Sequence, residues 1–294
     1  MVKKISDLYL DTRRALMTQE EKNMAGAMAR DLICHITGKR KEQLLAEQDM
    51  YVGDEVCLAT DAALKRLLDG EPLAYVMGQW DFYGMTLQVN PSVLIPRDDT
   101  CAVTALAIEK ALFLDTAPRI LDLCTGSGCI GLAVANRIKD AKVTLADISR
   151  EALSVARRNV ADQKLSKRVM CVQVDALKPP APMLGKFDMI ISNPPYITTQ
   201  EMQELPLSVK NYEPHLALHG GDDGLLFYRS VAENYKHALK PGGFLCLGFG
   251  MGQGNAVCDI LEKNDFTILE RSRDYNDRER AVLAQYRKEN EYGN

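Results

Sequence analysis

Apolar residues recur at helical spacing through the first part of the chain. Ile5, Leu8 and Leu16 fall on one helix face, and a Thr-x-x-Glu capping box that begins at Thr18 predicts the start of a second helix. Two shorter helical patterns follow before residue 70. The pattern predicts a small N-terminal helical domain over residues 1–71.

The pattern then changes to β-branched and aromatic residues separated by glycine and proline. This change predicts a β-hairpin linker over residues 72–96, and a helical pattern follows at 102–114 with its N-cap at Asp99 or Thr100. The predicted strands beyond it cover residues 119–123, 142–147, 168–174, 187–192, 243–249, 266–270 and 280–286. Seven strands with helices between most of them predict an α/β fold, a doubly wound sheet, over residues 97–294.

The strand at 187–192 ends abruptly at Asn193, Pro194, Pro195 and Tyr196. Because prolines cannot donate to a sheet ladder, the chain should turn outward here, at the carboxyl end of a strand, where open α/β sheets bind ligands. The Asn193 side-chain oxygen and the Pro194 carbonyl offer two acceptors to a planar –NH2 group, and Tyr196 offers an aromatic face to a flat group or a cation. This pattern indicates methyl transfer from S-adenosylmethionine to a planar amino nitrogen. A proline-rich turn with no chemical role would show the same four residues.

A glycine-rich loop joins the first predicted strand to the helix after it. Its residues are Cys124, Thr125, Gly126, Ser127 and Gly128. Glycines let the backbone approach a ligand closely, and the N-terminus of the following helix favours an anionic group such as a carboxylate. We expect Asp122 to accept a hydrogen bond from the cofactor's amino group, Asp147 to accept both hydroxyls of its ribose, and Asp175 to lie beside its adenine.

The same loop leaves a second class of cofactor open. Gly126, Gly128 and Gly131 satisfy the G-x-G-x-x-G pattern, which is also typical of nicotinamide and flavin dinucleotide sites and would make the protein an oxidoreductase. Neither Asp122 nor the segment 193–196 has an assigned role in hydride transfer, and both fit a methyl donor. The sequence therefore favours S-adenosylmethionine.

Composition limits the partners of the protein. The chain has 294 residues, a formal net charge of −4 at pH 7 and 26% charged residues. A DNA adenine amino-methyltransferase would need the same two acceptors for a flipped base. The acidic balance and the lack of an extra domain rich in Lys and Arg argue against it, so we expect no direct DNA binding.

No apolar run approaches the ~20 residues that span a bilayer, and no signal peptide is evident, which predicts a cytoplasmic protein without a membrane partner.

No metal site is predicted. The eight cysteines include no C-x-x-C pair, and in a reducing compartment they are most simply core residues. Glu213, His215 and His219 lie close together in the sequence, as in a metal triad, but no fourth ligand is evident.

Taken together, these motifs resemble those of the peptide chain release factor glutamine methyltransferases. They are residues 94–97 (Leu-Ile-Pro-Arg), 122–128 (Asp-Leu-Cys-Thr-Gly-Ser-Gly), 193–197 (Asn-Pro-Pro-Tyr-Ile), 212–214 (Tyr-Glu-Pro) and 220–225 (Gly-Gly-Asp-Asp-Gly-Leu). The resemblance covers nearly the whole chain and implies a seven-stranded, Rossmann-like class I methyltransferase domain. The implied reaction methylates the side-chain nitrogen of the glutamine in the Gly-Gly-Gln loop of bacterial release factors, with S-adenosyl-L-homocysteine as the second product. The helical domain is implied to help hold the release factor.

The resemblance also assigns roles to individual residues. The loop 124–128, Asp147, Asp175 and Ala176 would bind S-adenosylmethionine. Asn193, Pro194 and Tyr196 would be the catalytic residues, with Asn193 also in contact with the cofactor. These three would bind the substrate together with Pro195, Ile197 and Glu213. The chain departs from the family at two positions, because Cys101 and Gly248 stand where the family usually has Glu.

Overall fold

The computed structural model describes residues 2–287, so that residue 1 and residues 288–294, the outer ends of the two predicted domains, lie outside the described part. The chain divides into two compact units. The helical unit consists of residues 1–79 and 206–212, and the sheet unit of residues 80–205 and 213–294. The first boundary falls inside the predicted hairpin linker. The segment 206–212, which the sequence pattern assigns to the domain at 97–294, groups with the helical unit.

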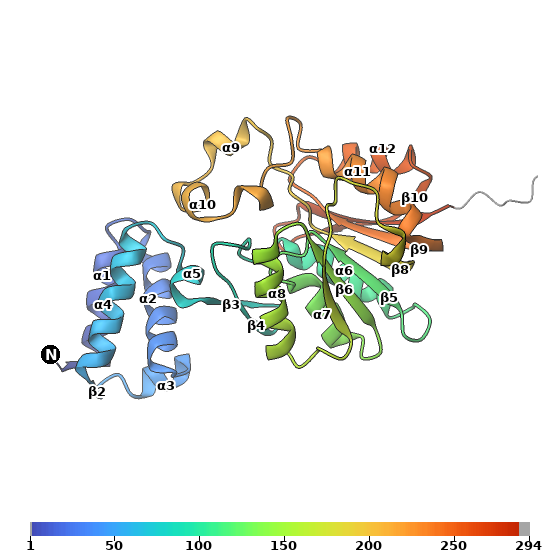
Figure 1. The fold of residues 1–294 in the computed structure, drawn as a ribbon. Helices are drawn as coiled ribbons and strands as arrows, with labels where there is room; N and C mark the ends of the chain where they lie inside the picture. The colour runs from blue at the N-terminus through green and yellow to red at the C-terminus, as the bar shows by residue number, and fades with distance from the viewer. Residues whose placement is uncertain (1, 288–294) are drawn as a thin grey trace, which may run out of the picture. The chain divides into compact units, whose positions relative to one another are not determined.

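The helical unit is built from amphipathic helices that share one small core. Its elements are β1 (Lys3–Lys4), α1 (Ile5–Leu16), α2 (Lys22–Thr37), α3 (Lys41–Ala46), β2 (Tyr51–Val52), α4 (Asp54–Leu68), α5 (Leu73–Met77) and α10 (Leu207–Tyr212). In Figure 1, α1, α2 and α4 lie side by side, and Ile5, Leu8 and Ile33 are buried in the core that they share. The Tyr212 hydroxyl donates a hydrogen bond of 2.9 Å to the Asp69 carbonyl, which fastens α10 to the end of α4.

The second predicted helix does form, but the predicted capping box does not. α2 begins at Lys22 with Glu21 as its N-cap, and no side chain caps it. The Thr18 hydroxyl instead donates to the Ala15 carbonyl at 2.7 Å. The capping prediction was wrong because Thr18 belongs to the turn that ends α1.

All seven predicted strands are present in one sheet of the sheet unit. They are β5 (Arg119–Leu123), β6 (Lys142–Asp147), β7 (Val169–Gln173), β8 (Phe187–Ser192), β9 (Leu239–Gly248), β10 (Phe266–Arg273) and β11 (Glu279–Tyr286). Their order across the sheet is β10-β11-β9-β8-β5-β6-β7, and β11 is antiparallel to both of its neighbours. A short turn rather than a crossover helix joins β10 to β11, and so short a connection makes consecutive strands run antiparallel.

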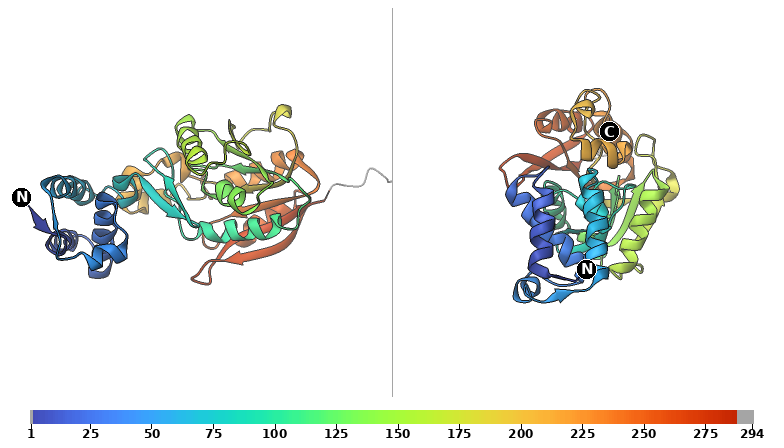
Figure 2. Two further views of the ribbon diagram at one scale, coloured as in Figure 1. Left: turned by 90° about the horizontal axis from the view of Figure 1, so that it is seen from below. Right: turned by 90° about the vertical axis from the view of Figure 1, so that its left-hand side faces the viewer.

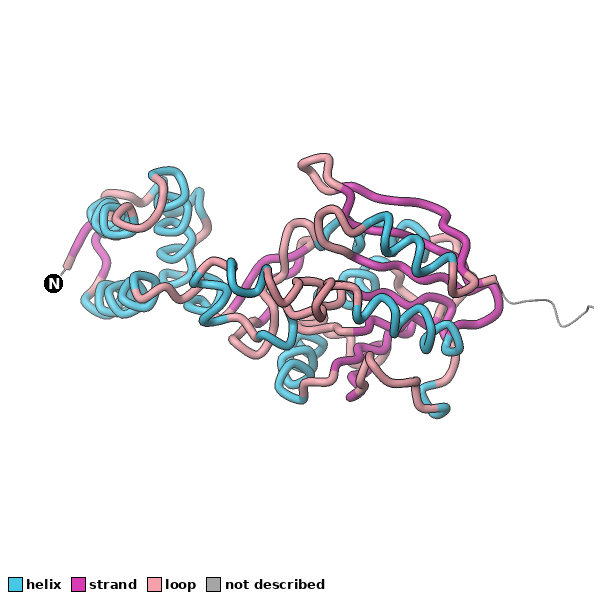
Figure 3. The backbone as a smooth tube through the Cα atoms, turned by 90° about the horizontal axis from the view of Figure 1, so that it is seen from above, coloured by secondary structure: helices cyan, strands magenta, loops and turns pink. Residues whose placement is uncertain are grey.

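Helices cover both faces of this sheet. Its helices α6 (Thr100–Ala111), α7 (Cys129–Arg137) and α8 (Arg150–Asp162) pack on the face seen from below in Figure 2. The helices α11 (Leu226–Asn234) and α12 (Gly254–Glu262) pack on the face seen from above in Figure 3. Side chains alternate along each strand, so that Ile120 joins the core under α7 whereas Leu121 and Leu123 join the core under α11. The alternation places Asp122 on the same face as Ile120, beneath the start of α7.

The predicted β-hairpin is present as β3 (Gln79–Phe82) and β4 (Met85–Gln88), which meet at Tyr83 and Gly84, two residues with positive φ. Short helices complete the chain: η1 (Pro182–Leu184), α9 (Glu201–Glu204), η2 (His215–Ala217) and η3 (Tyr235–Ala238). Asn159 on α8 holds the end of β4, since it accepts from the Gln88 N–H at 2.7 Å and donates to the Gln88 carbonyl at 3.0 Å. The same buried amide donates to the Ser127 carbonyl at 2.9 Å. Asn159 therefore joins the hairpin to the glycine-rich loop.

Candidate active site

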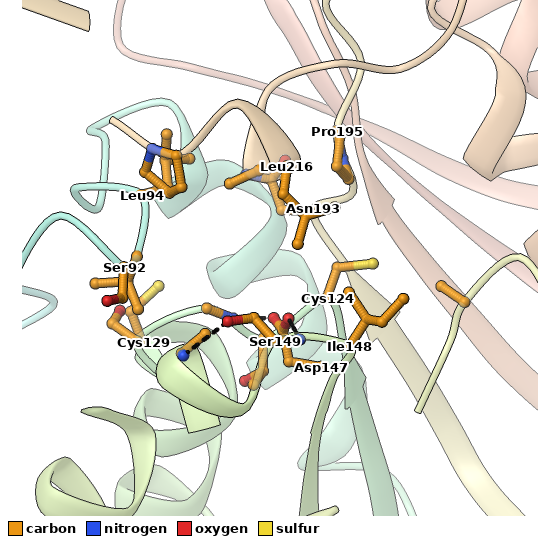
Figure 4. A pocket seen from close by; sticks show the side chains of 18 of the residues that line it. Ser92, Leu94, Cys124, Cys129, Asp147, Ile148, Ser149, Asn193, Pro195 and Leu216 are labelled. Atoms are coloured by element: carbon orange, nitrogen blue, oxygen red, sulfur yellow. Dashed lines mark hydrogen bonds between the residues drawn. The ribbon is translucent and has the colours of Figure 1, made fainter. Parts of the chain in front are cut away.

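A pocket opens at the carboxyl ends of β5, β6, β7 and β8, and it holds about 1030 Å³ of empty space when its open mouth is included. Its lining includes the predicted residues Cys124, Thr125, Gly126, Ser127, Asp147, Asp175, Ala176, Asn193 and Pro195. The other predicted residues, Asp122, Gly128, Pro194, Tyr196, Ile197 and Glu213, lie outside this lining. Figure 4 shows Asn193 and Pro195 on one side of the pocket and Asp147, Ile148 and Ser149 on the opposite side. The loop after β5 and the segment after β8 therefore share one cavity.

The glycine-rich loop turns sharply between β5 and α7. Cys124, Gly126 and Gly128 have φ values of 60°, 54° and 86°, in the left-handed region that favours glycine. Gly128 is also tightly enclosed, because a Cβ atom there would lie 3.0 Å from the Leu145 side chain. The turn brings the N-terminus of α7 to the pocket, where Cys129 joins the lining. Burial raises the pKa of both the Cys124 and the Cys129 thiol, so both stay protonated and neither is a candidate nucleophile.

Asp122 lies beneath this loop. Its Oδ2 accepts hydrogen bonds from the Thr125 hydroxyl at 2.5 Å and from the Gly131 N–H at 2.9 Å. Its Oδ1 is buried and has no hydrogen-bond partner within residues 2–287. Burial raises the pKa of Asp122 to about 7, and the two hydrogen bonds oppose that rise. Asp122 is 1% exposed and supports the loop from below, so the geometry favours this supporting position over the direct cofactor contact expected from the sequence.

Asp147 stands at the end of β6 and faces the glycine-rich loop. Its Oδ2 accepts from the Gly126 N–H at 2.9 Å, and its Oδ1 accepts from the Ser149 N–H at 3.0 Å. Burial raises the pKa of Asp147, while these backbone hydrogen bonds lower it. Asp147 also lines the pocket, and a carboxylate has about four acceptor positions, so it can accept from a ligand bound there as well.

The loop after β7 forms another part of the lining and is held from the opposite face of the sheet. The Tyr235 hydroxyl donates to the Asp175 carbonyl at 3.1 Å. The Ser230 hydroxyl donates to the Ala176 carbonyl at 2.8 Å. Ile148, an exposed apolar residue, lines the same pocket. Ile148 and Ala176 give this part of the lining an apolar edge, which suits a flat aromatic ring.

The segment after β8 is held by contacts with several elements. The Asn193 Nδ2 donates to the Thr100 hydroxyl at 3.4 Å, and the Gln253 Nε2 donates to the Tyr196 carbonyl at 3.0 Å. Ile197 forms an isolated parallel bridge with the chain that follows η2. Burial raises the pKa of Tyr196, so its phenol is neutral at physiological pH. The segment is therefore fixed at both ends while Asn193 stays on the pocket lining.

Glu213 is buried, and both of its carboxylate oxygens are engaged within the protein. Its Oε1 pairs with the Arg97 guanidinium, and its Oε2 accepts from the Ile95 N–H at 3.2 Å. These contacts tie Pro96 to Pro214, which both line the pocket. Glu213 therefore shapes the pocket wall rather than offering a free carboxylate to a substrate.

The described part of the chain offers neither a metal site nor a membrane-spanning helix. Within residues 2–287, no three His, Cys, Asp or Glu side chains are grouped so that they could hold a metal ion. The His219 ring of the imagined triad is hydrogen-bonded to the Thr199 hydroxyl at 3.0 Å. No helix of the same residues is long and apolar enough to span a bilayer.

Sequence reasoning missed several residues that hold the pocket in shape. They are Asn159, Ser230, Tyr235 and Gln253, which all bind main-chain carbonyls. Contacts to the main chain leave no motif, because any sequence at the partner position provides the same carbonyl. Thr100, predicted only as a possible N-cap, contacts the Asn193 amide and also lines the pocket. The alternation of side chains along β5 could have predicted that Asp122 lies on the same face of the sheet as Ile120, beneath α7.

The fold and the site define a class. The strand order with one antiparallel strand, the glycine-rich loop after β5 and the acidic residue after β6 are those of class I S-adenosylmethionine-dependent methyltransferases. A family model described as "Methyltransferase small domain" matches residues 100–208, and one described as "PrmC N-terminal domain" matches residues 7–78. A solved methyltransferase from Pyrococcus furiosus matches over 78% of this chain and 100% of its own, with 19% identity and a TM-score of 0.51, which supports the fold alone.

Relatives in sequence place the chain more narrowly. A release factor glutamine methyltransferase from Clostridium acetobutylicum is 39% identical over 213 residues, which cover 72% of this chain and 74% of that protein. Another from Thermodesulfovibrio yellowstonii is 36% identical over 258 residues, which cover 87% of this chain and 91% of that protein. The chain belongs to the release factor glutamine methyltransferase family.

Proposed function

We propose that this protein transfers a methyl group from S-adenosylmethionine to the side-chain amide nitrogen of the glutamine in the Gly-Gly-Gln loop of peptide chain release factors. The observation that carries the proposal is that Asn193 lines the same pocket as Asp147 and the glycine-rich loop. Donor and acceptor sites therefore share one cavity. Membership of the family supports the choice of substrate. Because a release factor acts on the ribosome, the proposal includes a cytoplasmic location.

The residues of the pocket fit S-adenosylmethionine. Asp147 lines the pocket and would accept hydrogen bonds from the ribose hydroxyls, alongside the N–H groups of Gly126 and Ser149. The loop N–H groups and the N-terminus of α7 favour the carboxylate of the cofactor. The apolar edge at Ile148 and Ala176 would accommodate the adenine ring, with Asp175 beside it.

Catalysis in this proposal depends on holding a poor nucleophile. When bound, S-adenosylmethionine supplies a methyl group on a positively charged sulfur. The glutamine nitrogen reacts reluctantly because its lone pair is delocalised into the amide. Hydrogen bonds from its –NH2 group to the Asn193 oxygen and the Pro194 carbonyl would orient it, and positioning of this kind can lower a barrier by roughly 7–11 kcal/mol.

The same two acceptors would also stabilise the transition state. As positive charge develops on the nitrogen, both hydrogen bonds strengthen, which favours the transition state over the bound substrate. The methylated nitrogen then loses one of its two protons to water, which restores a neutral amide. Pro195, the next residue after these two acceptors, lies on the pocket lining. Tyr196 and Ile197 anchor the segment that carries Asn193 and Pro194.

The helical unit, by the same proposal, holds the release factor. It has a hydrophobic core of its own, and it leaves Leu45, Tyr51 and Leu58 largely exposed. The match of residues 7–78 to an N-terminal domain model of this family supports the assignment.

A methylation assay tests the function directly. The purified protein is incubated with S-adenosylmethionine carrying a labelled methyl group and offered three substrates separately: a release factor, the same factor with its Gly-Gly-Gln glutamine changed to Ala, and duplex DNA that contains adenine. Mass spectrometry locates the added methyl. We expect label on the glutamine of the unchanged factor alone. Label on DNA, or equal label on the factor that lacks the glutamine, would refute the proposal.

A further inference from the structure

Four glycines surround the segment 193–196 so closely that a side chain on any of them would overlap it. They are Gly220, Gly224, Gly248 and Gly250. A Cβ atom built on Gly220 would lie 2.6 Å from the Tyr196 Cα, and one on Gly250 would lie 2.8 Å from the Tyr196 ring. Gly224 would meet the Tyr196 carbonyl in the same way. These three glycines therefore accommodate Tyr196, and the fourth has a different neighbour.

Gly248, the last residue of β9, lies against the side chain of Asn193. A Cβ atom on Gly248 would stand 2.5 Å from the Asn193 Oδ1, 3.2 Å from its Cγ and 3.4 Å from its Cβ. Atoms that are not bonded do not approach to 2.5 Å at such a contact, so the amide would have to rotate away. The φ of Gly248 is not in the left-handed region, so its backbone conformation does not require glycine. The requirement at this position is for space beside the Asn193 amide.

The other end of the amide is held only weakly. The Asn193 Nδ2 donates to the Thr100 hydroxyl over 3.4 Å, at the long limit for such a bond. Thr100 itself has a second contact of 3.4 Å with the Asp99 carboxylate. Because these contacts are long, a methyl group at residue 248 would meet little resistance in turning the amide. The absence of a side chain at residue 248 therefore permits the present orientation of the amide, which the long contact with Thr100 does not enforce by itself.

We propose that Gly248 is a positioning residue, whose lack of a side chain sets the orientation of the Asn193 amide that accepts the substrate –NH2 group. This inference rests on the proposed function of Asn193. A side chain at position 248 would exclude the present orientation of this acceptor amide.

The Gly248→Ala variant tests the inference. Its crystal structure should show the Asn193 side chain in a different rotamer, and its kcat on the release factor should fall by about 10- to 100-fold. S-adenosyl-L-homocysteine should still bind, because Asp147 and the glycine-rich loop are unchanged in this variant. Gly53→Ala is the matched control, since Gly53 also has an ordinary negative φ and no atom lies within 4 Å of the added Cβ.

A double variant separates positioning from a general disturbance. In an Asn193→Ala background the overlap disappears, because the Oδ1 and Cγ atoms are gone and the two Cβ atoms lie 3.4 Å apart. Adding Gly248→Ala to Asn193→Ala should therefore cost less than about twofold in kcat. If the single variant fails to fold, the double variant should still fold, which would support the same overlap.

Three outcomes would overturn the inference. They are an unmoved Asn193 in the Gly248→Ala crystal structure, an unchanged kcat, or a further tenfold loss in the double variant. The crystal structure needs no substrate, so it reports on Gly248 independently of the reaction. A parent protein that leaves the release factor unmethylated would refute the proposed function instead, and the position of Asn193 in the variant would still decide whether Gly248 orients it.

Discussion

Replacing Asp122 by Asn should remove a pH-dependent loss of stability. Asp122 is 1% exposed, and burial raises its pKa from 3.8 to about 7. The unfolded chain releases this proton near its ordinary pKa, whereas the folded protein keeps it until about pH 7. The stability that the retained proton provides is therefore fully present below about pH 4 and is lost as the pH rises toward 7. Each full pH unit in this window costs about 1.4 kcal/mol and the loss tapers as the pH nears 7, so the free energy of unfolding should fall by about 2 kcal/mol between pH 5 and pH 7.

Urea unfolding of the parent and of Asp122→Asn at pH 5, 6, 7 and 8 measures this loss. The useful quantity is the difference in unfolding free energy between the two proteins, because the other titrating groups cancel. That difference should change by about 2 kcal/mol, to the disadvantage of the parent, between pH 5 and pH 7, and then level off above pH 7. Asp188→Asn is the control, since Asp188 is a sheet carboxylate that keeps Lys240 as its partner at 2.7 Å. Parallel pH curves for the parent and Asp122→Asn would refute the reasoning, because they would show that Asp122 is ionised in the folded protein.

Further variants test the pocket and the helical unit. Asp147→Ala should weaken the binding of S-adenosyl-L-homocysteine by about 100-fold in calorimetric titration, because two hydrogen bonds to a charged acceptor are lost; an unchanged affinity would place the ribose elsewhere. Asn193→Ala should lower kcat by about two to three orders of magnitude with an unchanged circular dichroism spectrum, whereas near-native turnover would make its amide structural. Arg97→Ala should lower the free energy of unfolding by roughly 1–3 kcal/mol, because it leaves the buried Glu213 carboxylate without its charged partner. Glu213→Gln should cause a smaller loss. A larger loss for Glu213→Gln than for Arg97→Ala in urea unfolding would contradict this. Deleting residues 1–71 should leave a protein that binds cofactor but has a raised KM for the release factor, and an unchanged KM would exclude the recognition role.

The strands could be predicted because each contains a short stretch rich in apolar residues. The run at 187–192 stops at two prolines, and the structure places β8 over the same residues. The place of β11 between β9 and β10 could not be predicted in this way, since apolar periodicity is local and carries no information on which strands become neighbours. The error at Thr18 has a similar cause. Its sequence fits a capping box for α2, but its hydroxyl bonds to the Ala15 carbonyl at the end of α1.

The candidate site could be predicted where a residue follows directly from a strand end. Asp147 and Asn193 stand at the carboxyl ends of β6 and β8, the parallel strands on either side of β5, and both line the pocket. Residues that act across the fold could not be found, because nothing local marks them. Gln253 reaches the Tyr196 carbonyl from 57 positions away, and Asn159 reaches β4 from 71 positions away. Contacts of this kind depend on the assembled sheet rather than on any short stretch of sequence.

The assignment of residues 206–212 to the helical unit means that the chain passes between the two units three times, after residues 79, 205 and 212. A terminal domain on a single linker can be exchanged by one recombination event. Here the exchange of residues 1–79 alone would bring in a foreign bundle while α10, which groups with that unit, stays behind from the original parent. The Tyr212 side chain would then meet the end of a foreign helix in place of α4. Chimeras between relatives should therefore carry both segments from the same parent.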